Sequence, residues 1–296
     1  MLCELRVTGR LCVAAGRRSG ENARVDRLPF WLSIGVLSLL QGATVALVRI
    51  PEPVRARIGR PRVAFAAIPA LSVIVFVVLV RAVAQSAQAL TYLALVAVPL
   101  LAAAALAMLA GRRLSVPLAG ALFALAWAGS GSLAGELAGA GLDALSCAAL
   151  GGALVLLAPR RALALGIYAM AAVDATLIVV EELQRPNSVL NAVHPPAQLP
   201  QLQAEIFGSA VMGYGDLFVA GVLGGLLALH AGRSMQLRGA IAVATLALLF
   251  DLLFFAVHEL PATVPVAGAL ALHDGWRHRA AGSLLRRSRS HGAAVH

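Results

Sequence analysis

The chain contains no lysine, and only 13% of its 296 residues are charged. Soluble domains have about 25% charged and about 45–50% apolar residues. Here 60% of the residues are hydrophobic and the mean hydropathy is +0.84. This shortage of charge excludes an ordinary soluble protein and predicts a multi-pass integral membrane protein. The apolar runs are long and do not alternate, so the expected fold class is all-α and not a β-barrel.

Cysteine is also scarce. Cys3, Cys12 and Cys147 have neither the paired spacing of a disulfide framework nor that of a zinc site, so we expect no metal and no cofactor. With lysine absent, arginine alone supplies the cations behind the net charge of +10. The arginines lie in short loops and tails, where they are typical anchors for lipid headgroups. We therefore expect the lipid bilayer, and no nucleic acid, as a partner.

Nine apolar runs approach the length of about 20 residues that a helix needs to cross a hydrocarbon core about 30 Å thick. The predicted spans cover residues 29–49, 63–84, 88–110, 115–135, 142–158, 162–183, 205–231, 238–257 and 260–273. The sequence divides into a basic N-terminal tail (1–28), a five-helix membrane region (29–158), a region with the remaining four spans (159–273) and a basic C-terminal tail (274–296).

Two connections matter for this scheme. The sequence ELAGAGLD over 136–143 is the predicted break between the fourth and fifth spans. A polar, proline-rich loop over 184–203 is predicted to join the sixth and seventh spans.

The loops alternate between arginine-rich and arginine-poor along the nine predicted spans. By the positive-inside rule this alternation predicts a cytoplasmic C-terminus, in what we expect to be the plasma membrane of a prokaryote. The arginine-rich N-terminal tail falls on the opposite side and contradicts the pattern, so the sequence leaves the orientation open.

Three acidic residues fall well inside predicted spans: Asp174, Asp216 and Asp251. A charge at the bilayer centre costs about 2.5–3.5 kcal/mol on insertion scales, so such residues mark proton relays, transport pathways or catalytic sites by default. A structural hydrogen bond between helices is the alternative. At about 1.5 Å per residue, Asp174 and Asp216 would lie about 14 and 17 Å from the same membrane face. If their spans pack together, the two carboxyls meet near the middle of the membrane.

Two facing carboxyls about 3 Å apart cannot both ionise, so they share one proton. The ionised member can take a proton from water, while the protonated member donates one to a peptide carbonyl. This is the chemistry of aspartic proteases, and it makes Asp174 and Asp216 the candidate catalytic pair.

Glycines and prolines lie close to the acids in the sequence. Gly213 and Gly215 remove side chains beside Asp216 and allow close approach of another backbone, although helix packing is an equal explanation. Pro261 and Pro265 would disturb the start of a helix and leave backbone groups free for an extended peptide. They could equally be ordinary first-turn prolines.

Three motifs in this order resemble the presenilin and signal peptide peptidase family, the GxGD intramembrane aspartyl proteases. The motifs are AVDATLIVV (172–180), GYGD (213–216) and LPATVP (260–265). The resemblance implies nine spans, the catalytic aspartates Asp174 and Asp216, no cofactor, and transmembrane-helix proteins as substrates. It identifies no accessory subunit.

The resemblance covers about residues 160–275 and also implies residues that shape the site or contact the substrate. These are Gly213, Tyr214, Gly215, Pro261, Ala262 and Thr263. Three positions depart from the family pattern. Val173 stands where the family usually has tyrosine, Tyr214 where it has an aliphatic residue or phenylalanine, and Thr263 where it has leucine.

Other functions remain open. A prepilin peptidase also carries GxGD, but with lysine two residues after the aspartate, where this chain has Phe218. A proton-coupled transporter or channel could use Asp174, Asp216 and Asp251 as a relay, with His258 and Glu259 at its mouth. A non-catalytic membrane scaffold is the last alternative.

Overall fold

A computed structural model describes residues 28–52, 62–82, 85–180, 182, 184–257 and 259–275. Nearly all of the predicted N-terminal and C-terminal tails lies outside these residues. The described part is almost entirely helical, which confirms the predicted all-α class in its main feature. Its sheet structure is limited, within the described ranges, to one two-stranded hairpin.

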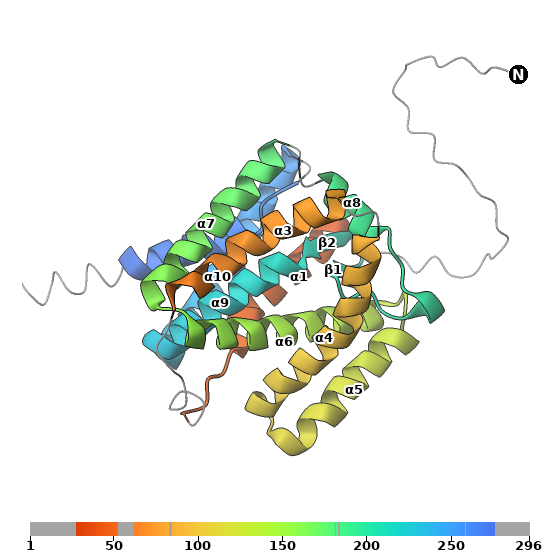
Figure 1. The fold of residues 1–296 in the computed structure, drawn as a ribbon, viewed down its shortest axis with the longest axis horizontal. Helices are drawn as coiled ribbons and strands as arrows, with labels where there is room; N and C mark the ends of the chain where they lie inside the picture. The colour runs from red at the N-terminus through yellow and green to blue at the C-terminus, as the bar shows by residue number, and fades with distance from the viewer. Residues whose placement is uncertain are drawn as a thin grey trace, which may run out of the picture.

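Figure 1 labels the α-helices that follow among the described residues. They are α1 (Phe30–Leu47), α3 (Ile68–Ala82), α4 (Ser86–Leu109), α5 (Arg112–Ala128), α6 (Leu133–Leu157), α7 (Arg160–Val179), α8 (Gln184–Asn191), α9 (Tyr214–His230) and α10 (Arg233–Asp251). A further helix covers residues 263–275, and the short 3-10 helices are η1 (Val63–Ala67), η2 (Pro196–Gln198) and η3 (Leu252–Phe255).

Six helical segments of the described chain are long and apolar enough to cross a membrane. They are Phe30–Leu47, Val63–Arg81, Ser86–Leu109, Leu133–Leu157, Arg160–Val179 and Arg233–Phe255. The count of nine spans remains a prediction, since α9 is apolar but has only 17 residues.

The predicted break over 136–143 is wrong, because these residues lie inside α6. The chain breaks earlier, at Gly131, whose φ of 80° an L-residue rarely adopts. Ser132 then caps the helix, with its Oγ accepting a hydrogen bond from the Gly135 N–H at 3.2 Å. The fifth predicted span is therefore nine residues longer at its start than expected.

The predicted helix over 205–231 is also wrong in its first part, where the chain forms an antiparallel hairpin. Strands β1 (Ala204–Phe207) and β2 (Ala210–Gly213) pair with Glu205 opposite Met212, and α9 begins only at Tyr214. Gly208 takes a φ of 58° at the first central position of the two-residue turn, as such hairpins require.

Side chains from two helices hold this turn in place. The Glu136 Oε2 atom accepts a hydrogen bond from the Gly208 N–H at 2.7 Å. The Ser33 Oγ atom accepts one from the Ser209 N–H at 3.2 Å. Side chains of α6 and α1 accept hydrogen bonds from both amides of the turn. These bonds stabilise the hairpin in place of the predicted continuous helix.

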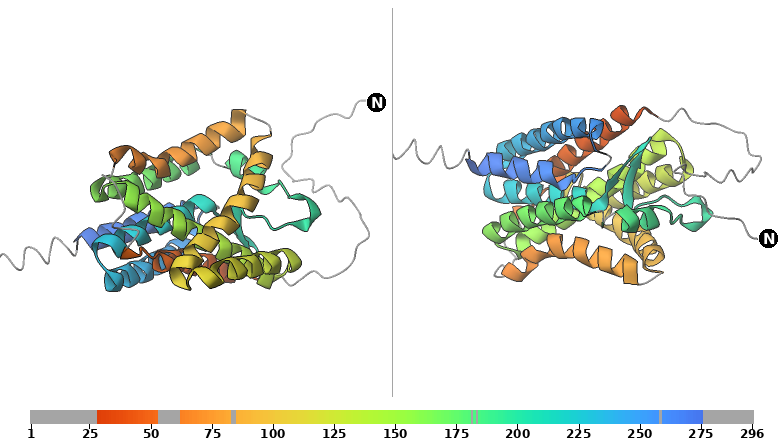
Figure 2. Two further views of the ribbon diagram at one scale, coloured as in Figure 1. Left: turned by 60° about the horizontal axis from the view of Figure 1, so that its bottom comes forward. Right: turned by 90° about the horizontal axis from the view of Figure 1, so that it is seen from above.

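Helix α9 lies in the middle of the bundle, and α4 and α5 lie beyond α6 from it (Figure 1; Figure 2). Glycines let α6 and α9 touch backbone to backbone: a Cβ built on Gly151 would lie 2.1 Å from the Gly221 carbonyl carbon. Gly224 makes a similar approach to Val45 of α1. The glycines in this part of α9 therefore serve helix packing.

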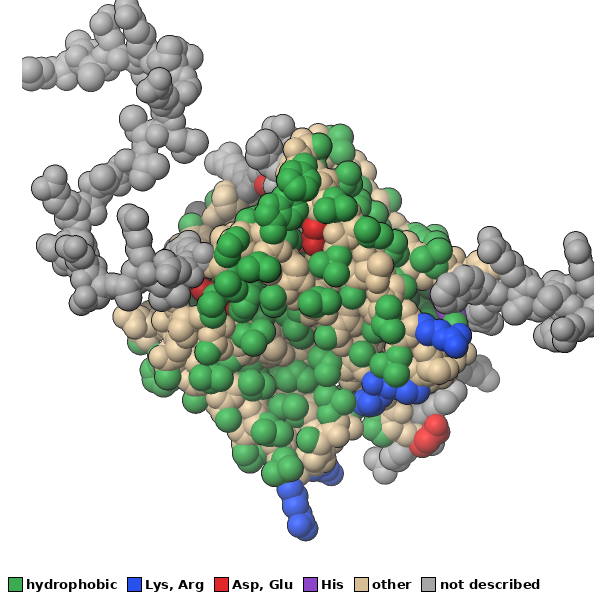
Figure 3. All heavy atoms as spheres, turned by 180° about the vertical axis from the view of Figure 1, so that it is seen from behind, with side chains coloured by type: hydrophobic (Ala, Val, Ile, Leu, Met, Phe, Trp, Pro, Cys, Tyr) green, Lys and Arg blue, Asp and Glu red, His purple; other side chains and the backbone are tan. Residues whose placement is uncertain are grey.

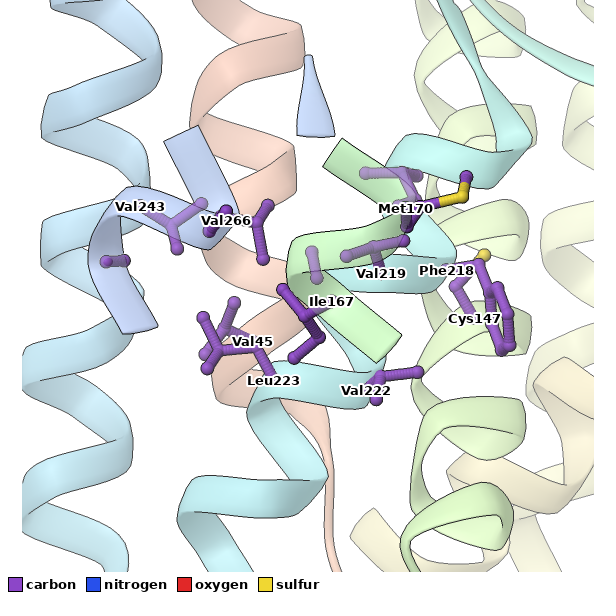
Figure 4. Packing of buried hydrophobic residues seen from close by; sticks show 14 of the residues in the cluster. Val45, Cys147, Ile167, Met170, Phe218, Val219, Val222, Leu223, Val243 and Val266 are labelled. Carbon is purple, nitrogen blue, oxygen red and sulfur yellow. The ribbon is translucent and has the colours of Figure 1, made fainter. Parts of the chain in front are cut away.

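Apolar side chains from four other elements converge on α9 (Figure 4). They include Val45 of α1, Cys147 of α6, Ile167 and Met170 of α7, and Val243 of α10, which pack around Val219, Val222 and Leu223.

The outer surface is also largely apolar. Hydrophobic side chains cover most of the face in Figure 3, and arginines lie toward its border. On α3 the large residues Leu71, Ile74, Val75 and Val78 are all exposed. A contiguous apolar surface of this kind marks contact with lipid or with another protein.

The glycine contact between α6 and α9 predicts a specific stability difference. Gly151→Ala should lower the thermal unfolding midpoint of the detergent-purified protein, because the new methyl group would overlap the Gly221 backbone. Such overpacking costs about 1–3 kcal/mol or more. Gly141→Ala on the same helix is the control, since its Cβ meets nothing within 4 Å and alanine favours a helix. Equal midpoints for the two variants would contradict the packing.

Candidate active site

Asp174 lies in the last third of α7 and is only 6% exposed. The Thr263 Oγ1 hydroxyl donates a hydrogen bond to Asp174 Oδ2 at 2.7 Å, and the Thr263 backbone N–H also donates to this carboxylate. Thr263 is the first residue of the helix over 263–275. The Asp174 carboxyl therefore lies at the N-terminus of that helix, where unpaired amides favour negative charge.

Asp216 lies in the first turn of α9 and is partly exposed. Its Oδ2 atom accepts a hydrogen bond from the Gly213 N–H at 3.1 Å, so the side chain caps its own helix. The expected position of Asp216, eleven residues inside a spanning helix, is wrong. The hairpin replaces the first turns of the predicted helix and delivers the carboxyl to a helix end.

The Asp174 and Asp216 carboxyls are close enough to interact electrostatically. They come from different helices, α7 and α9, and each is held by a donor near a helix N-terminus. The structure thus brings together Asp174, Asp216 and Thr263. Carboxyls that approach to about 3 Å can hold one proton between them and act as an acid and a base.

The two glycines of the GYGD motif have different surroundings. A Cβ on Gly213 would lie 3.1 Å from Asp216 Oδ2, closer than ordinary van der Waals contact. A Cβ on Gly215 would lie 3.5 Å from the Met170 Cε atom, an ordinary contact. Close packing against the carboxyl therefore gives a direct reason for glycine at position 213 alone.

Tyr214 fixes the motif from the side of α6. Its hydroxyl shares a hydrogen bond of 2.7 Å with Ser146 Oγ, and its carbonyl oxygen accepts a weak bond from the Cys147 thiol at 3.7 Å. The departure from the family pattern at this position has a physical account here, because a phenylalanine could not bond to Ser146.

The segment before the last helix is fixed by α1. The Gln41 Nε2 amide, fully buried in α1, donates to the Ala262 carbonyl oxygen at 2.7 Å. The Pro261 carbonyl accepts from the Val264 N–H at 3.0 Å. The expectation that these backbone groups are free for a peptide is wrong for both carbonyls. Pro265 lies in the first helical turn, where its missing N–H costs nothing.

Asp251 belongs to a different contact. It lies at the end of α10, and its Oδ2 atom accepts a hydrogen bond from Ser38 Oγ of α1 at 2.6 Å. The suggested partner His258 lies outside the described residues. Among the residues that are described, no three His, Cys, Asp or Glu side chains are grouped to hold a metal ion.

Sequence reasoning missed three polar residues near the site: Gln41, Asp143 and Glu205. All three are at most 1% exposed. The signals were present, since Gly208–Ser209 between two short apolar runs is typical of a hairpin and Ser132 before an apolar run is typical of a helix start. Recognising them would have put Glu205 on a strand and Asp143 in mid-helix.

Comparison with protein-family models, with curated proteins and with solved structures finds no match to this chain.

The hydrogen bond between Thr263 and Asp174 predicts an energetic coupling. Thr263→Val should lower the free energy of unfolding by about 1–3 kcal/mol, because it removes a donor from a buried carboxylate. Thr263→Ser keeps the hydroxyl and should cost less. Unfolding in detergent measures both, and the Thr263→Val cost should shrink in an Asp174→Asn background. An unchanged cost there would show that the hydrogen bond does not stabilise the fold.

Proposed function

We propose that this protein is an intramembrane aspartyl protease that hydrolyses peptide bonds of transmembrane segments with the pair Asp174 and Asp216. One observation carries the proposal. Asp174 of α7 and Asp216 of α9 lie on helices that pack together, with the Met170 Cε atom beside Gly215, in a bundle that has six helices apolar and long enough to cross a membrane. Ionisable side chains inside such a bundle are costly and mark a functional site by default.

Membrane embedding is supported by the outer surface as well as by helix length. The apolar face in Figure 3 and the exposed leucines and valines of α3 would contact lipid. We keep the expected plasma membrane of a prokaryote and the cytoplasmic C-terminus as parts of the proposal; the alternation of arginines along the predicted loops favours that orientation, and the arginine-rich N-terminal tail opposes it.

The proposed reaction is hydrolysis of an amide with water. The ionised carboxyl takes a proton from water, whose oxygen attacks the carbonyl carbon, while the protonated carboxyl gives its proton to the carbonyl oxygen. The tetrahedral intermediate then breaks its C–N bond. The carboxyl that took a proton from water gives it to the leaving nitrogen, and the other carboxyl takes a proton back from a hydroxyl of the intermediate as the new C=O forms, so the pair again holds one proton. Asp216 is the more exposed of the two, so it is the carboxyl nearer to entering water.

The hairpin supports a peptide substrate in extended form. Strand β2 runs directly into Gly213 and Asp216, so a peptide lying along this hairpin would approach the pair in an extended conformation. A transmembrane helix must unwind to expose its amides, so substrates with weak helix propensity at the cleavage position should react fastest.

A three-aspartate proton relay has less support. Asp251 bonds to Ser38 of α1, whereas Asp174 bonds to Thr263 and interacts with Asp216. The activity test below separates the two functions, because only the protease requires peptide cleavage.

Replacing either carboxyl of the pair should abolish proteolysis. Asp174→Asn and Asp216→Asn keep the side-chain volume but remove the acid and base, and general acid–base catalysis contributes about 10²–10⁴-fold. The measurement is cleavage of a helical membrane peptide by the full-length protein in liposomes. Asp251→Asn is the matched control and should remain active. Cleavage that persists in either pair variant rejects the assignment, and loss only in Asp251→Asn shows that the wrong acids were chosen.

The two motif glycines should differ in the same assay. Gly213→Ala should reduce kcat, because the new methyl group would push against Asp216 Oδ2. Gly215→Ala meets only the flexible end of Met170 and should retain most of the activity. Equal losses in the two variants would mean that the contact with the carboxyl is not what requires glycine.

A further inference from the structure

Two further acidic residues are buried near the proposed catalytic pair. Asp143 of α6 is 1% exposed and Glu205 of β1 is fully buried. In the described structure, no other residue donates a hydrogen bond to either carboxyl. Unpartnered buried polar atoms are uncommon in native structures, because each costs about 1–3 kcal/mol and charged groups cost more.

These acids continue the pair into a series. Strand β1 packs against α6, and the hydrogen bond between Gly208 and Glu136 ties the hairpin turn to that helix, so Glu205 of β1 lies alongside the helix that carries Asp143. The same hairpin leads through β2 into the first turn of α9, where Asp216 lies against α7. Within this arrangement Glu205 is an electrostatic neighbour of both Asp143 and Asp216. The series runs from α6 through the hairpin to the start of α9 and on to α7. Each member is therefore neighboured by at least one other carboxyl.

The side chains around Asp143 and Glu205 provide no bonded positive charge to balance these two acids. α1, η1 and β2 contribute no titratable side chain at all. The titratable residues of the packed helices are Tyr92 of α4, Arg112 and Arg113 of α5, Glu136 and Cys147 of α6, and Tyr214, Asp216 and His230 of α9. None of these bonds to either carboxyl.

Two adjacent, unpaired carboxylates are too costly inside a protein to be ionised together. A shared proton removes the repulsion and supplies a hydrogen bond that the ionised forms lack. Glu136 shows the contrast on the same helix, because its carboxylate accepts the Gly208 amide and has its own donor.

We propose that Asp143 and Glu205 form a second carboxyl pair that holds a proton in the resting protein and exchanges it with the catalytic pair through Asp216. The proton-holding part of this proposal stands on the buried acids alone, whereas the exchange rests on the proposed protease function. The second pair would supply or accept a proton so that the catalytic pair stays singly protonated while water binds and product leaves.

The direct test is infrared spectroscopy of the full-length protein in detergent at neutral pH. The parent is the double variant Asp174→Asn with Asp216→Asn, so the catalytic pair contributes no signal. We expect a C=O stretching band of a protonated carboxylic acid that shifts in D₂O. Adding Asp143→Asn or Glu205→Gln should remove or displace this band, and Glu136→Gln should leave it unchanged.

A parent without such a band overturns the proposal, and so does a band that both Asp143→Asn and Glu205→Gln leave unchanged. If Glu205→Gln fails to fold, the spectra of the parent and of Asp143→Asn still test the proton-holding part of the proposal. The infrared measurement needs no enzymatic activity, so its result is independent of whether the protein is a protease.

The exchange is tested by the pH dependence of cleavage with the catalytic pair intact. Glu205→Gln removes the one negative charge that the singly protonated second pair carries beside Asp216, so the acidic limb of the kcat profile should move to lower pH. Glu136→Gln should keep the original profile, although it alters the same hairpin. An unmoved limb in Glu205→Gln rejects the exchange, while the absence of cleavage in the unmodified protein rejects the protease function itself.

Discussion

The backbone contact between α6 and α9 is the constraint on which the site depends. Gly151 and Gly221 allow the two helices to touch, and this contact carries Tyr214 to Ser146 and so fixes the start of α9. Asp216 lies two residues further on, and its position relative to α7 follows from that start. Small residues in the helix interior thus position an acid that lies at the helix end.

Two acids of the series are held by hydrogen bonds and two are not. Asp174 accepts from Thr263 of the last helix and Asp216 accepts from Gly213 at the end of β2, whereas no other residue donates to Asp143 or Glu205. Ionisable groups inside a membrane-spanning bundle are by default candidates for a functional site. The hairpin, the Gln41 contact and the glycine packing all serve to hold these groups in one place.

Much of the fold was predictable because long apolar runs leave the backbone few choices, so the helical class and most helix positions followed. The hairpin over 204–213 was not found, since short apolar strands look like a continued helix until Gly208 is recognised as a turn. The depth argument for Asp174 and Asp216 assumed that missing helix; in the structure the hairpin places Asp216 at the start of α9, which packs against α7, the helix that carries Asp174. The sequence signals at Gly208 and Ser132 could have placed Glu205 on a strand and Asp143 inside a helix, but the contacts of these residues and of Gln41 join distant segments and do not follow from local sequence.

The central claim is that Asp174 and Asp216 act as one unit on a peptide carbonyl. A peptide that carries a hydroxyl-bearing, non-hydrolysable mimic of the tetrahedral intermediate measures this directly, because such mimics bind far more tightly than substrates. We predict saturable binding to the full-length protein in liposomes and its loss in both Asp174→Asn and Asp216→Asn. Binding that survives either substitution, or no preference for the mimic over a peptide without the hydroxyl, would contradict the account.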